Sequence, residues 1–534
     1  MKNTQFENYM NIPEEKFSFV ECNDYKHDKK FETKPVGYFR DAMRRFAKNK
    51  GSVIAAVVLL ILTLFAIIGP YCCDQGYQDS YQTETLLRRY KELPPRVTLF
   101  DGTGFWDGSK TQDVSSGRLA ILKGIAIETG YDPITKVLEE HTTVDPFGKT
   151  KTSYTISLNT YNAIDSFTIT LTYEDYKAIQ DWQKENNLQV IMPRVDEDLV
   201  PIYAMGQVSV WYKSDKKGNP ILDADGNYQS GYYTQAKSMI MDSTKYNDDY
   251  DSIRLDSDPG KADPTDVNRY HYARRTGKEE TGYNYVIRVN PTNYFIYKYG
   301  FEPAFIFGTD SKGYDIFSRL ASGARFSLIL ALCVSIVNLT VGAIIGALEG
   351  YYGGLFDMVT ERVIDVLARI PGIVVQILFQ LHLAHRVGIV GSLVFAFILT
   401  GWIGMASSVR TQFYRFKHQE YVLAARTLGA RDSRIIWKHI FPNSLGTLIT
   451  GTVLVIPGVI YSETSLSYLG IINLDSATMS SVGTMLNKGQ AVLTTAPHVV
   501  LFPALFIAAL MLSFNLFGNG LRDAFNPQLR GSEG

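Results

Sequence analysis

The residue types that most often carry out chemistry in enzymes form no catalytic pattern in this 534-residue sequence. A phosphate-binding loop needs a glycine at a fixed distance before Gly-Lys, and no Gly-Lys pair here has it. The zinc-protease pattern H-E-x-x-H is also missing. His382 and His385 lie close together, but no carboxylate or third ligand follows, which favours a surface turn over a metal site. The four cysteines are Cys22, Cys72, Cys73 and Cys333. They form no C-x-x-C pair, so we expect neither enzymatic activity nor a metal or cofactor bound by this chain.

A second group of candidates consists of polar side chains inside long apolar runs. Glu463 closes an otherwise uncharged run, and Asn338 and Gln376 lie within two others. A carboxylate inside a membrane is a functional suspect by default, although solvation or pairing near the outer boundary is the favoured alternative for Glu463. The two amides either line a pathway or form hydrogen bonds between helices. Glu463, Asn338 and Gln376 are therefore candidates for a pathway or a gate.

Two further patterns favour a structural interpretation. Asp365 and Arg369 are one helical turn apart, so we expect them to pair with each other. The spacing of Asp223, Asp225 and Asn227 is partly that of a calcium loop, but the acidic residue needed at the loop end is missing. A hairpin turn is favoured there.

The elements that must position these residues are six apolar runs. A helix needs about 20 apolar residues to cross a bilayer core. The runs are 52–68, 326–348, 363–383, 387–409, 444–462 and 499–521. The first lies too far from the N-terminus for a signal peptide, so it predicts an uncleaved transmembrane helix over 52–70 that stops at Gly69-Pro70. The sequence thus predicts a six-span membrane protein, and the net charge of −1 argues against a nucleic-acid partner.

Lysines and arginines indicate the orientation of the spans. The N-terminal segment 1–51, the connection 410–443 and the tail 522–534 all carry excess positive charge close to a span. Six spans place all three on one side of the membrane, which the positive-inside rule assigns to the cytoplasm. Both termini are then expected to be cytoplasmic in a bacterial cell membrane, with the polar segment 74–303 outside.

The segment 74–303 is too long for an unstructured loop, so we expect a folded domain. Alternation of apolar and polar residues predicts strands at Tyr154 to Leu158 and Phe167 to Tyr173. Glu174 to Asn187 is predicted to be helical, with Tyr176, Ile179 and Trp182 on one face. Val208 to Tyr212 and the turn residues after it indicate hairpins. The expected class is α+β, inserted between the first helix and a permease core at 307–521.

The connection 410–443 contains the most specific pattern in the sequence. Tyr421 to Leu428 favour a short helix, and Gly429 is predicted to end it because a positive φ costs little without a Cβ. Asp432 or Ser433 is predicted to cap a second helix, after which Pro442 begins the next span. Such a unit would be a rigid protrusion with two small residues that permit close docking.

This stretch, from Glu420-Tyr-Val-Leu-Ala-Ala-Arg-Thr-Leu-Gly429 to Pro442-Asn443, resembles the EAA loop of ABC importer permeases. Phe307-Gly-Thr-Asp310, Gly350-Tyr-Tyr-Gly-Gly354, Glu463-Thr-Ser-Leu466 and the ending Gly518 to Pro527 resemble segments of dipeptide and oligopeptide permease C subunits. The similarity covers the first helix and about 307–530. Tyr314 and Ser407 stand where that family usually has arginine, and the segment 74–303 is much longer than the family's loop.

The resemblance implies an all-α membrane protein of the type I ABC importer permease fold with six transmembrane helices, here with an inserted α+β extracytoplasmic domain. It implies that the loop is a coupling helix that binds a groove on an ATPase subunit. The residues carried over to that role are Glu420, Tyr421, Ala424, Ala425, Arg426, Gly429, Ala430 and Arg431.

The resemblance also implies partners in the membrane. These are a second, related permease, two ATPase subunits that bind ATP and Mg²⁺, and an extracytoplasmic peptide-binding protein, which we expect to be lipid-anchored. The implied function is alternating-access import of oligopeptides or dipeptides. Two alternatives stay open: import of nickel or another small solute, and a membrane-anchored receptor that uses the external domain.

Overall fold

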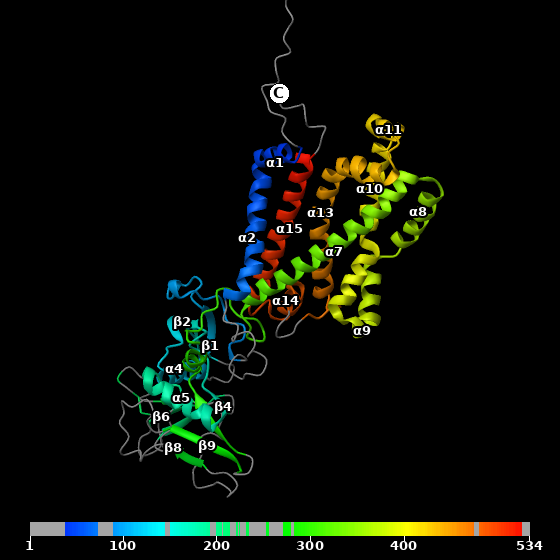
Figure 1. Cartoon of the computed structure of the whole chain (residues 1–534). Helices are drawn as coiled ribbons and strands as arrows, with labels where there is room; N and C mark the ends of the chain where they lie inside the picture. Colours follow the sequence, from blue (N-terminus) through cyan, green and yellow to red (C-terminus); the bar gives the residue numbers. More distant parts are fainter. Residues whose placement is uncertain are drawn as a thin grey trace, which may run out of the picture.

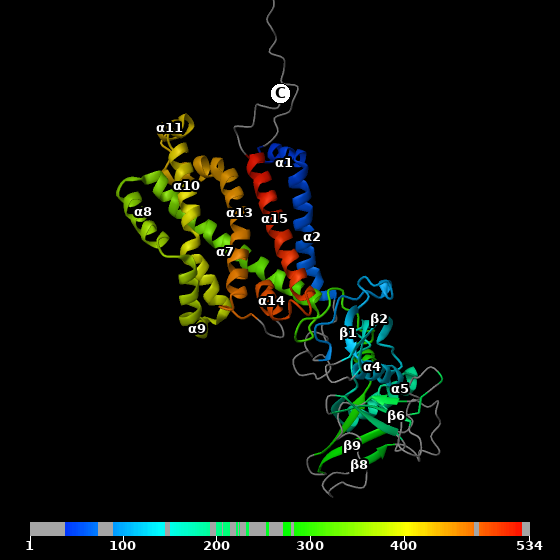
Figure 2. The same ribbon diagram turned by 180° about the vertical axis from the view of Figure 1, so that it is seen from behind.

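The computed structural model describes residues 38–72, 89–144, 150–192, 199–204, 207–213, 221–222, 224, 231–233, 252–255, 271–278, 282–474 and 480–525. Asp223, Asp225, Asn227, Cys22 and Cys73 lie outside the described residues. The chain forms a helical bundle and a separate lobe rich in strands, which lies at one end of the bundle (Figure 1). Helices α1 and α11 lie at the opposite end, as the reverse view also shows (Figure 2).

The bundle is built from long apolar helices and the shorter helices that flank them. Its elements are α1 (Tyr38–Lys48), α2 (Lys50–Cys72), α7 (Ile316–Tyr352), α8 (Gly354–Ala368), α9 (Gly372–Gly401), α10 (Ile403–Phe416), α13 (Phe441–Tyr468), α14 (Val482–Gly489) and α15 (His498–Phe525). Within the described residues, 5 helical stretches are long and apolar enough to cross a membrane. The first of them, α2, continues through Pro70 to Cys72 instead of stopping at Gly69.

The third predicted run is divided differently from the prediction. A single helix from 363 to 383 was expected, but α8 ends at Ala368 and α9 begins at Gly372. Pro371 lies in the break, since proline disfavours helical backbone in the residue before it. Arg369 is the C-cap residue that directly follows α8, and the predicted pair is wrong because Asp365 pairs with Arg362 at 3.0 Å.

Gly388 reverses the chain within α9. Its backbone is non-helical, with φ 81°, and Gln380 Nε2 donates to the carbonyl oxygen of Ile389 at 3.1 Å. In a straight helix, nine residues would separate these groups by about 13 Å along the axis. The chain must therefore fold back at Gly388, which divides the 45-residue stretch 372–416 into two arms. These arms lie where the third and fourth runs were predicted.

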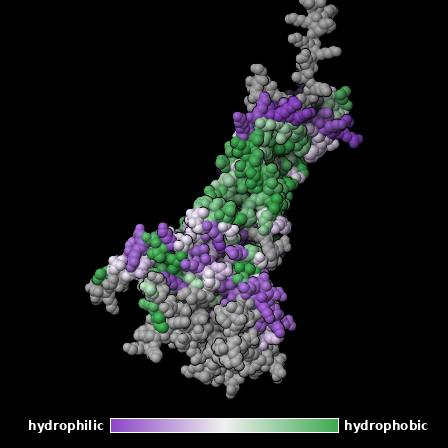
Figure 3. All heavy atoms as spheres, turned by 90° about the vertical axis from the view of Figure 1, so that its left-hand side faces the viewer, coloured by the Kyte–Doolittle hydropathy of each residue, from purple (hydrophilic) through white to green (hydrophobic). Residues whose placement is uncertain are grey.

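Helix α7 is the centre of the bundle because it packs against α2, α10 and α13. Gly342, Gly346 and Gly350 form a stripe on α7 that faces α10. A Cβ on Gly346 would collide with the carbonyl oxygen of Ala406, so only glycine permits this approach. The side of the bundle that faces the viewer in Figure 3 is largely apolar, and a polar band follows at the end that carries α1.

Within its described residues, the lobe contains three antiparallel sheets. The strands are β1 (Ser109–Ser115), β2 (Ile134–Val144), β3 (Thr150–Asn159), β4 (Phe167–Thr172), β5 (Leu199–Ala204), β6 (Gln207–Lys213), β7 (Gly231–Tyr233), β8 (Ser252–Leu255), β9 (His271–Lys278) and β10 (Gly282–Val289). Their orders are β1-β3-β2, β4-β10-β9-β8 and β5-β6-β7. The strands predicted near Tyr154, Phe167 and Val208 lie within β3, β4 and β6.

The helices of the lobe are α4 (Ser116–Thr129), α5 (Tyr173–Asn186) and α6 (Pro291–Tyr299), with the short turn η5 (Thr98–Phe100). Helix α5 follows the prediction closely: Thr172 caps it, and Tyr176 and Ile179 are buried against the sheet. The Tyr176 ring stacks on Tyr285 of β10, with centroids 5.2 Å apart. Trp182, on the same face, is only half-buried.

Candidate coupling site at one end of the bundle

The predicted coupling residues lie on α11 (Glu420–Thr427) and on the turn that follows it. This unit projects beyond the end of the bundle, away from the lobe (Figures 1 and 2). The exposed members of the predicted set are Glu420, Tyr421, Ala424, Arg426, Gly429 and Arg431. Ala425 and Ala430 are partly buried. The structure thus brings all eight residues together on one protrusion.

Gly429 ends α11 in the way the sequence predicts. Its φ is 79°, in the left-handed region. The Gly429 N–H donates to the carbonyl oxygen of Arg426 at 3.0 Å, and the Ala430 N–H donates to that of Ala425 at 3.0 Å. These two bonds form a Schellman motif, which satisfies carbonyl groups left free at a helix end. A Cβ on Gly429 would meet nothing within 4 Å in this chain, so the surface around it is open.

The second half of the protrusion differs from the prediction. Helix α12 (Asp432–Arg434) has Arg431 at its N-cap position, with no side-chain capping bond, so neither Asp432 nor Ser433 caps it. The chain continues through a π-helical segment, η7 (Ile435–Ile440), directly into α13, where Pro442 lies in the first turn as expected. The protrusion is therefore joined to a spanning helix without a loop.

Asp432 instead bonds to the end of α7. Tyr351 donates its hydroxyl hydrogen to Asp432 Oδ1 at 2.5 Å, and Arg426 donates to the same hydroxyl at 3.3 Å. The Tyr351 side chain is buried. One tyrosine hydroxyl thus joins both halves of the protrusion to α7.

Apolar packing fixes the inner face of α11. Val422 is completely buried in a cluster with Phe413 of α10 and Ile435 and Ile436 of η7. Tyr421 accepts a hydrogen bond from Asn443 Nδ2 at 3.3 Å, and burial raises the pKa of its hydroxyl. The protrusion is therefore held to α7, α10 and α13 at once.

Two apolar residues of the outer face were missing from the predicted set. Leu428 is 88% exposed and Leu423 is 45% exposed. Large apolar side chains with this exposure at the tip of a protrusion are typical of a docking surface. Leucine within the recognised motif was a signal in the sequence, but its exposure depends on how α11 packs.

A cluster of charged residues joins α8 to α10 beside the protrusion. Arg410 forms a two-point contact with Asp357, with Nε–Oδ1 at 2.6 Å and a second bond of 3.0 Å, and lies 3.3 Å from Glu361. The hydrogen bonds from Arg410, and that from Tyr414 at 2.7 Å, lower the pKa of Asp357 below its usual range. Oxygens of Glu349, Asp357 and Glu361 lie within 4.8 Å of one another. Because the Arg410 guanidinium pairs with two of these carboxylates, we describe the cluster as an ion-pair network.

The three predicted pathway residues do not form one site. Glu463 is buried and accepts hydrogen bonds from Ser327 of α7 at 2.8 Å and from Ser467 at 2.9 Å. Asn338 is buried 11 residues further along α7 than Ser327, a rise of about 16 Å, and packs against Gly401. Gln376 lies half-exposed on α9. Their prediction as pathway residues stays untested, while the contacts of Glu463 join two helices.

Comparison with known proteins agrees with this arrangement. Residues 319–531 match the model of the family described as binding-protein-dependent transport system inner membrane component, and residues 37–95 match that of the N-terminal TM domain of oligopeptide transport permease C. Residues 96–318, which include the lobe, lie between the two matches.

Individual relatives are transport proteins. The chain is 42% identical to the oligopeptide transport system permease protein OppC of Bacillus subtilis, over 42% of this chain and 72% of that protein. It is 39% identical to the dipeptide transport system permease protein DppC of the same organism, over 42% of this chain and 69% of that protein. It is 36% identical to the glutathione transport system permease protein GsiD of Pectobacterium atrosepticum, over 46% of this chain and 81% of that protein.

A solved structure of the methionine ABC transporter MetNI in inward-facing conformations aligns with 39% of this chain and 96% of that chain, at 14% identity and a TM-score of 0.31. The family consists of transport subunits, which confirms the prediction that this chain is a permease component and not an enzyme. The chain belongs to the inner-membrane permease components of binding-protein-dependent transport systems, in the branch of the oligopeptide and dipeptide permease C subunits.

Proposed function

We propose that this chain is one of the two transmembrane subunits of an ATP-driven importer that moves oligopeptides or dipeptides by alternating access. The observation that carries the proposal is the α11 protrusion, which presents open, exposed residues beyond the bundle while its inner face is bound to three long helices. Relatives named as oligopeptide and dipeptide permeases support the cargo class. The proposed architecture is the six-helix type I importer permease fold.

The protrusion would transmit force between an ATPase subunit and the membrane helices. An ATPase that binds Leu428 and the surface around Gly429 would move α11 as a rigid unit, because the Schellman turn and the buried Val422 fix the conformation of the protrusion. The Tyr351 hydroxyl would pass that movement to α7, and the continuous η7 segment would pass it to α13. ATP acts in this scheme only through its differential affinity for the two conformations of the transporter.

The proposed assembly contains three kinds of partner. These are a second, related permease that completes a heterodimer, two ATPase subunits that bind ATP and Mg²⁺, and an extracytoplasmic binding protein that is lipid-anchored. The orientation that fits this assembly places both termini and α11 in the cytoplasm and the lobe outside. Basic residues support it, because they gather near α1 and in the connection 410–443.

The decisive experiment compares two glycines that both have a positive φ. Gly429 has φ 79° and Gly388 has φ 81°, and neither has an atom within 4 Å of its missing Cβ. Gly429→Asp and Gly388→Asp therefore add the same charge in open space at opposite ends of the bundle, and Gly388→Asp is the more strained of the two because its ψ of 162° lies in a region that essentially only glycine adopts. Each variant is expressed with the ATPase, permease and binding-protein partners and reconstituted into vesicles.

Gly429→Asp should lose ATPase recruitment and ATP-dependent uptake of a labelled short-peptide mixture, while Gly388→Asp should keep recruitment. Equal recruitment by both variants would exclude the protrusion as the coupling element. A wild-type complex that hydrolyses ATP but moves no peptide would point to nickel or another small solute as cargo. Failure of the wild-type chain to recruit any ATPase would favour a receptor.

A further inference from the structure

A short loop of the lobe, residues 97–106, exposes an unusual concentration of apolar side chains. Leu99 is 83% exposed and Phe105 is 64% exposed, with Phe100 and Trp106 half-buried beside them. The rings of Phe100 and Phe105 are 6.1 Å apart, and those of Phe105 and Trp106 are 5.3 Å apart. We call these residues the aromatic loop. Exposed apolar clusters of this kind mark an interaction surface.

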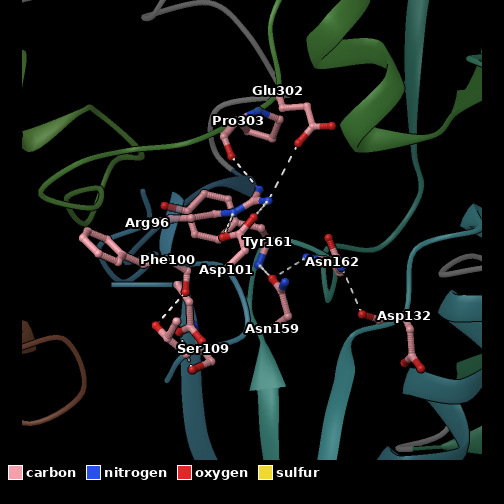
Figure 4. A network of polar contacts seen from close by, with 12 residues as sticks. Arg96, Phe100, Asp101, Ser109, Asp132, Asn159, Tyr161, Asn162, Glu302 and Pro303 are labelled. Carbon is pink, nitrogen blue, oxygen red and sulfur yellow. Dashed lines mark hydrogen bonds and ion pairs between the residues drawn. The ribbon is translucent and has the colours of Figure 1, made fainter. Parts of the chain in front are cut away.

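Polar contacts at its base hold the aromatic loop in shape. Arg96 donates to both carboxylate oxygens of Asp101, at 3.1 and 2.7 Å, and to the carbonyl oxygen of Pro303 at 3.0 Å. Figure 4 shows this network, with the Phe100 ring pointing away from it. Asp107 accepts from the Gly104 N–H at 2.7 Å and from the Ser109 N–H at 3.0 Å. The apolar tip is therefore presented by a built turn.

The carboxylates in and beside the aromatic loop have polar partners at its base. Asp101 is the one charged residue between 97 and 106, and its partner Arg96 is buried under the loop. Although burial raises it, the hydrogen bonds from Ser109 and Gly104 bring the pKa of Asp107 below its usual range. The tip thus exposes mainly apolar side chains, and its one carboxylate is paired with Arg96 at the base, which suits contact with the interfacial layer of a membrane.

The depth of the aromatic loop relative to the bundle is fixed by Phe502. This residue lies in the second turn of the spanning helix α15, about 6 Å along the axis from its first residue. Its ring stacks on Phe307 with centroids 4.3 Å apart, and the centroid of the Trp106 ring lies 6.2 Å from that of Phe502, with 29° between the two planes. Trp106 is therefore level with the first turns of a membrane helix, where the hydrocarbon gives way to headgroups.

Neighbouring residues mark the same level. Tyr71 lies in the last turn of α2, is 64% exposed, and accepts a hydrogen bond from Arg325 at 3.4 Å. Tyr and Trp rings gather at membrane–water interfaces because one part of the ring is apolar and the other is polar. The apolar belt of the bundle meets the lobe at this edge, and apolar patches continue on the adjoining part of the lobe (Figure 3).

We infer that the aromatic loop inserts into the interfacial layer of the bilayer and anchors the lobe to lipid. The partner is the lipid surface itself, selected by depth and apolar character and not by headgroup charge. Insertion of Leu99 and Phe105 would restrict the lobe to one inclination relative to the bundle, in addition to the Trp106–Phe502 contact. This inference does not depend on the transported cargo or on which side of the membrane the lobe lies.

The test measures where spin labels at the loop tip reside. In the complete transporter, reconstituted in lipid nanodiscs with the four native cysteines replaced by serine, labels are attached at Leu99→Cys and Phe105→Cys. Leu505→Cys, on the exposed side of α15 (56% exposed), is the lipid reference, and Tyr173→Cys, on α5 (51% exposed), is the aqueous reference. Electron paramagnetic resonance then compares collision with oxygen, which enriches in lipid, and with a water-soluble nickel complex.

The expected result is an oxygen-to-nickel accessibility ratio at Leu99 and Phe105 several-fold above that at Tyr173 and close to that at Leu505. Ratios equal to that at Tyr173 would overturn the inference, because the tip would then face water. Low access to both reagents would also overturn it and would show that a protein partner covers the loop. In a label-free check, lipids with brominated chains should quench wild-type tryptophan fluorescence more than that of Trp106→Phe, and equal quenching would contradict insertion.

Discussion

Removing one hydroxyl group at Tyr351 should loosen the α11 protrusion without disturbing the bundle. Tyr351→Phe keeps the buried ring but removes the bond to Asp432 and the one from Arg426. A hydrogen bond to a charged group contributes about 1.5–3 kcal/mol net. Asp432 and Arg426 are exposed and regain water, so we expect a loss of only about 1–2 kcal/mol, which corresponds to a 5–30-fold change in an opening equilibrium.

Hydrogen–deuterium exchange on the complete transporter in nanodiscs measures that opening directly. Amides of Glu420–Thr427 should exchange roughly 5–30 times faster in Tyr351→Phe, because local opening controls their exchange. Amides in the middle of α13 should be unchanged. The matched control is Tyr352→Phe, which removes the hydroxyl of the next residue, whose side chain is 58% exposed. Unchanged exchange in α11, or an equal effect of Tyr352→Phe, would refute the proposed link between α7 and the protrusion.

The other predictions concern packing, a buried carboxylate and a titrating amine. Gly346→Ala should destabilise the transporter by about 1–3 kcal/mol, because the added Cβ meets the Ala406 backbone. Thermal melting measures this loss. In the same assay Gly458→Ala, whose Cβ would lie in open space on α13, should be neutral or stabilising. Glu463→Ala should cost about 1–3 kcal/mol by leaving two buried serines without an acceptor; loss of transport in an equally stable Glu463→Gln would instead support a role in the pathway. Burial lowers the pKa of Lys488 to about 8. Roughly half of this amine is therefore neutral at pH 8, and its acylation rate, measured by mass spectrometry, should level off above that pH; a rate still rising at pH 10 would contradict the burial argument.

Local patterns in the sequence were sufficient where neighbouring residues decide the structure. The left-handed backbone of Gly429, the capped helix at Tyr173–Asn186 and the strands β3 and β4 follow from glycine geometry, capping and period-two alternation. The long apolar runs predicted the spanning helices, because hydrophobic length is a property of the chain alone.

Residues distant in sequence decided the rest. Asp432 was expected to cap its own helix, but Tyr351, 81 positions away, provides a partner that only folding brings near. Glu463 lies in an apolar run, and one of the two serines that donate to it, Ser327, belongs to α7 and is distant in sequence.

Which apolar side chains are exposed also depends on the tertiary structure. Leu428 and Phe105 are ordinary apolar residues in the sequence, and their composition does not distinguish them from core residues such as Val422. Whether such a side chain is buried depends on which elements pack beside it. The sequence by itself predicted which segments are long and apolar enough to cross a membrane, and where the protrusion turns. Only the tertiary structure decided what that protrusion contacts and where the aromatic loop lies relative to the bundle, because burial and depth are set by contacts between distant parts of the chain.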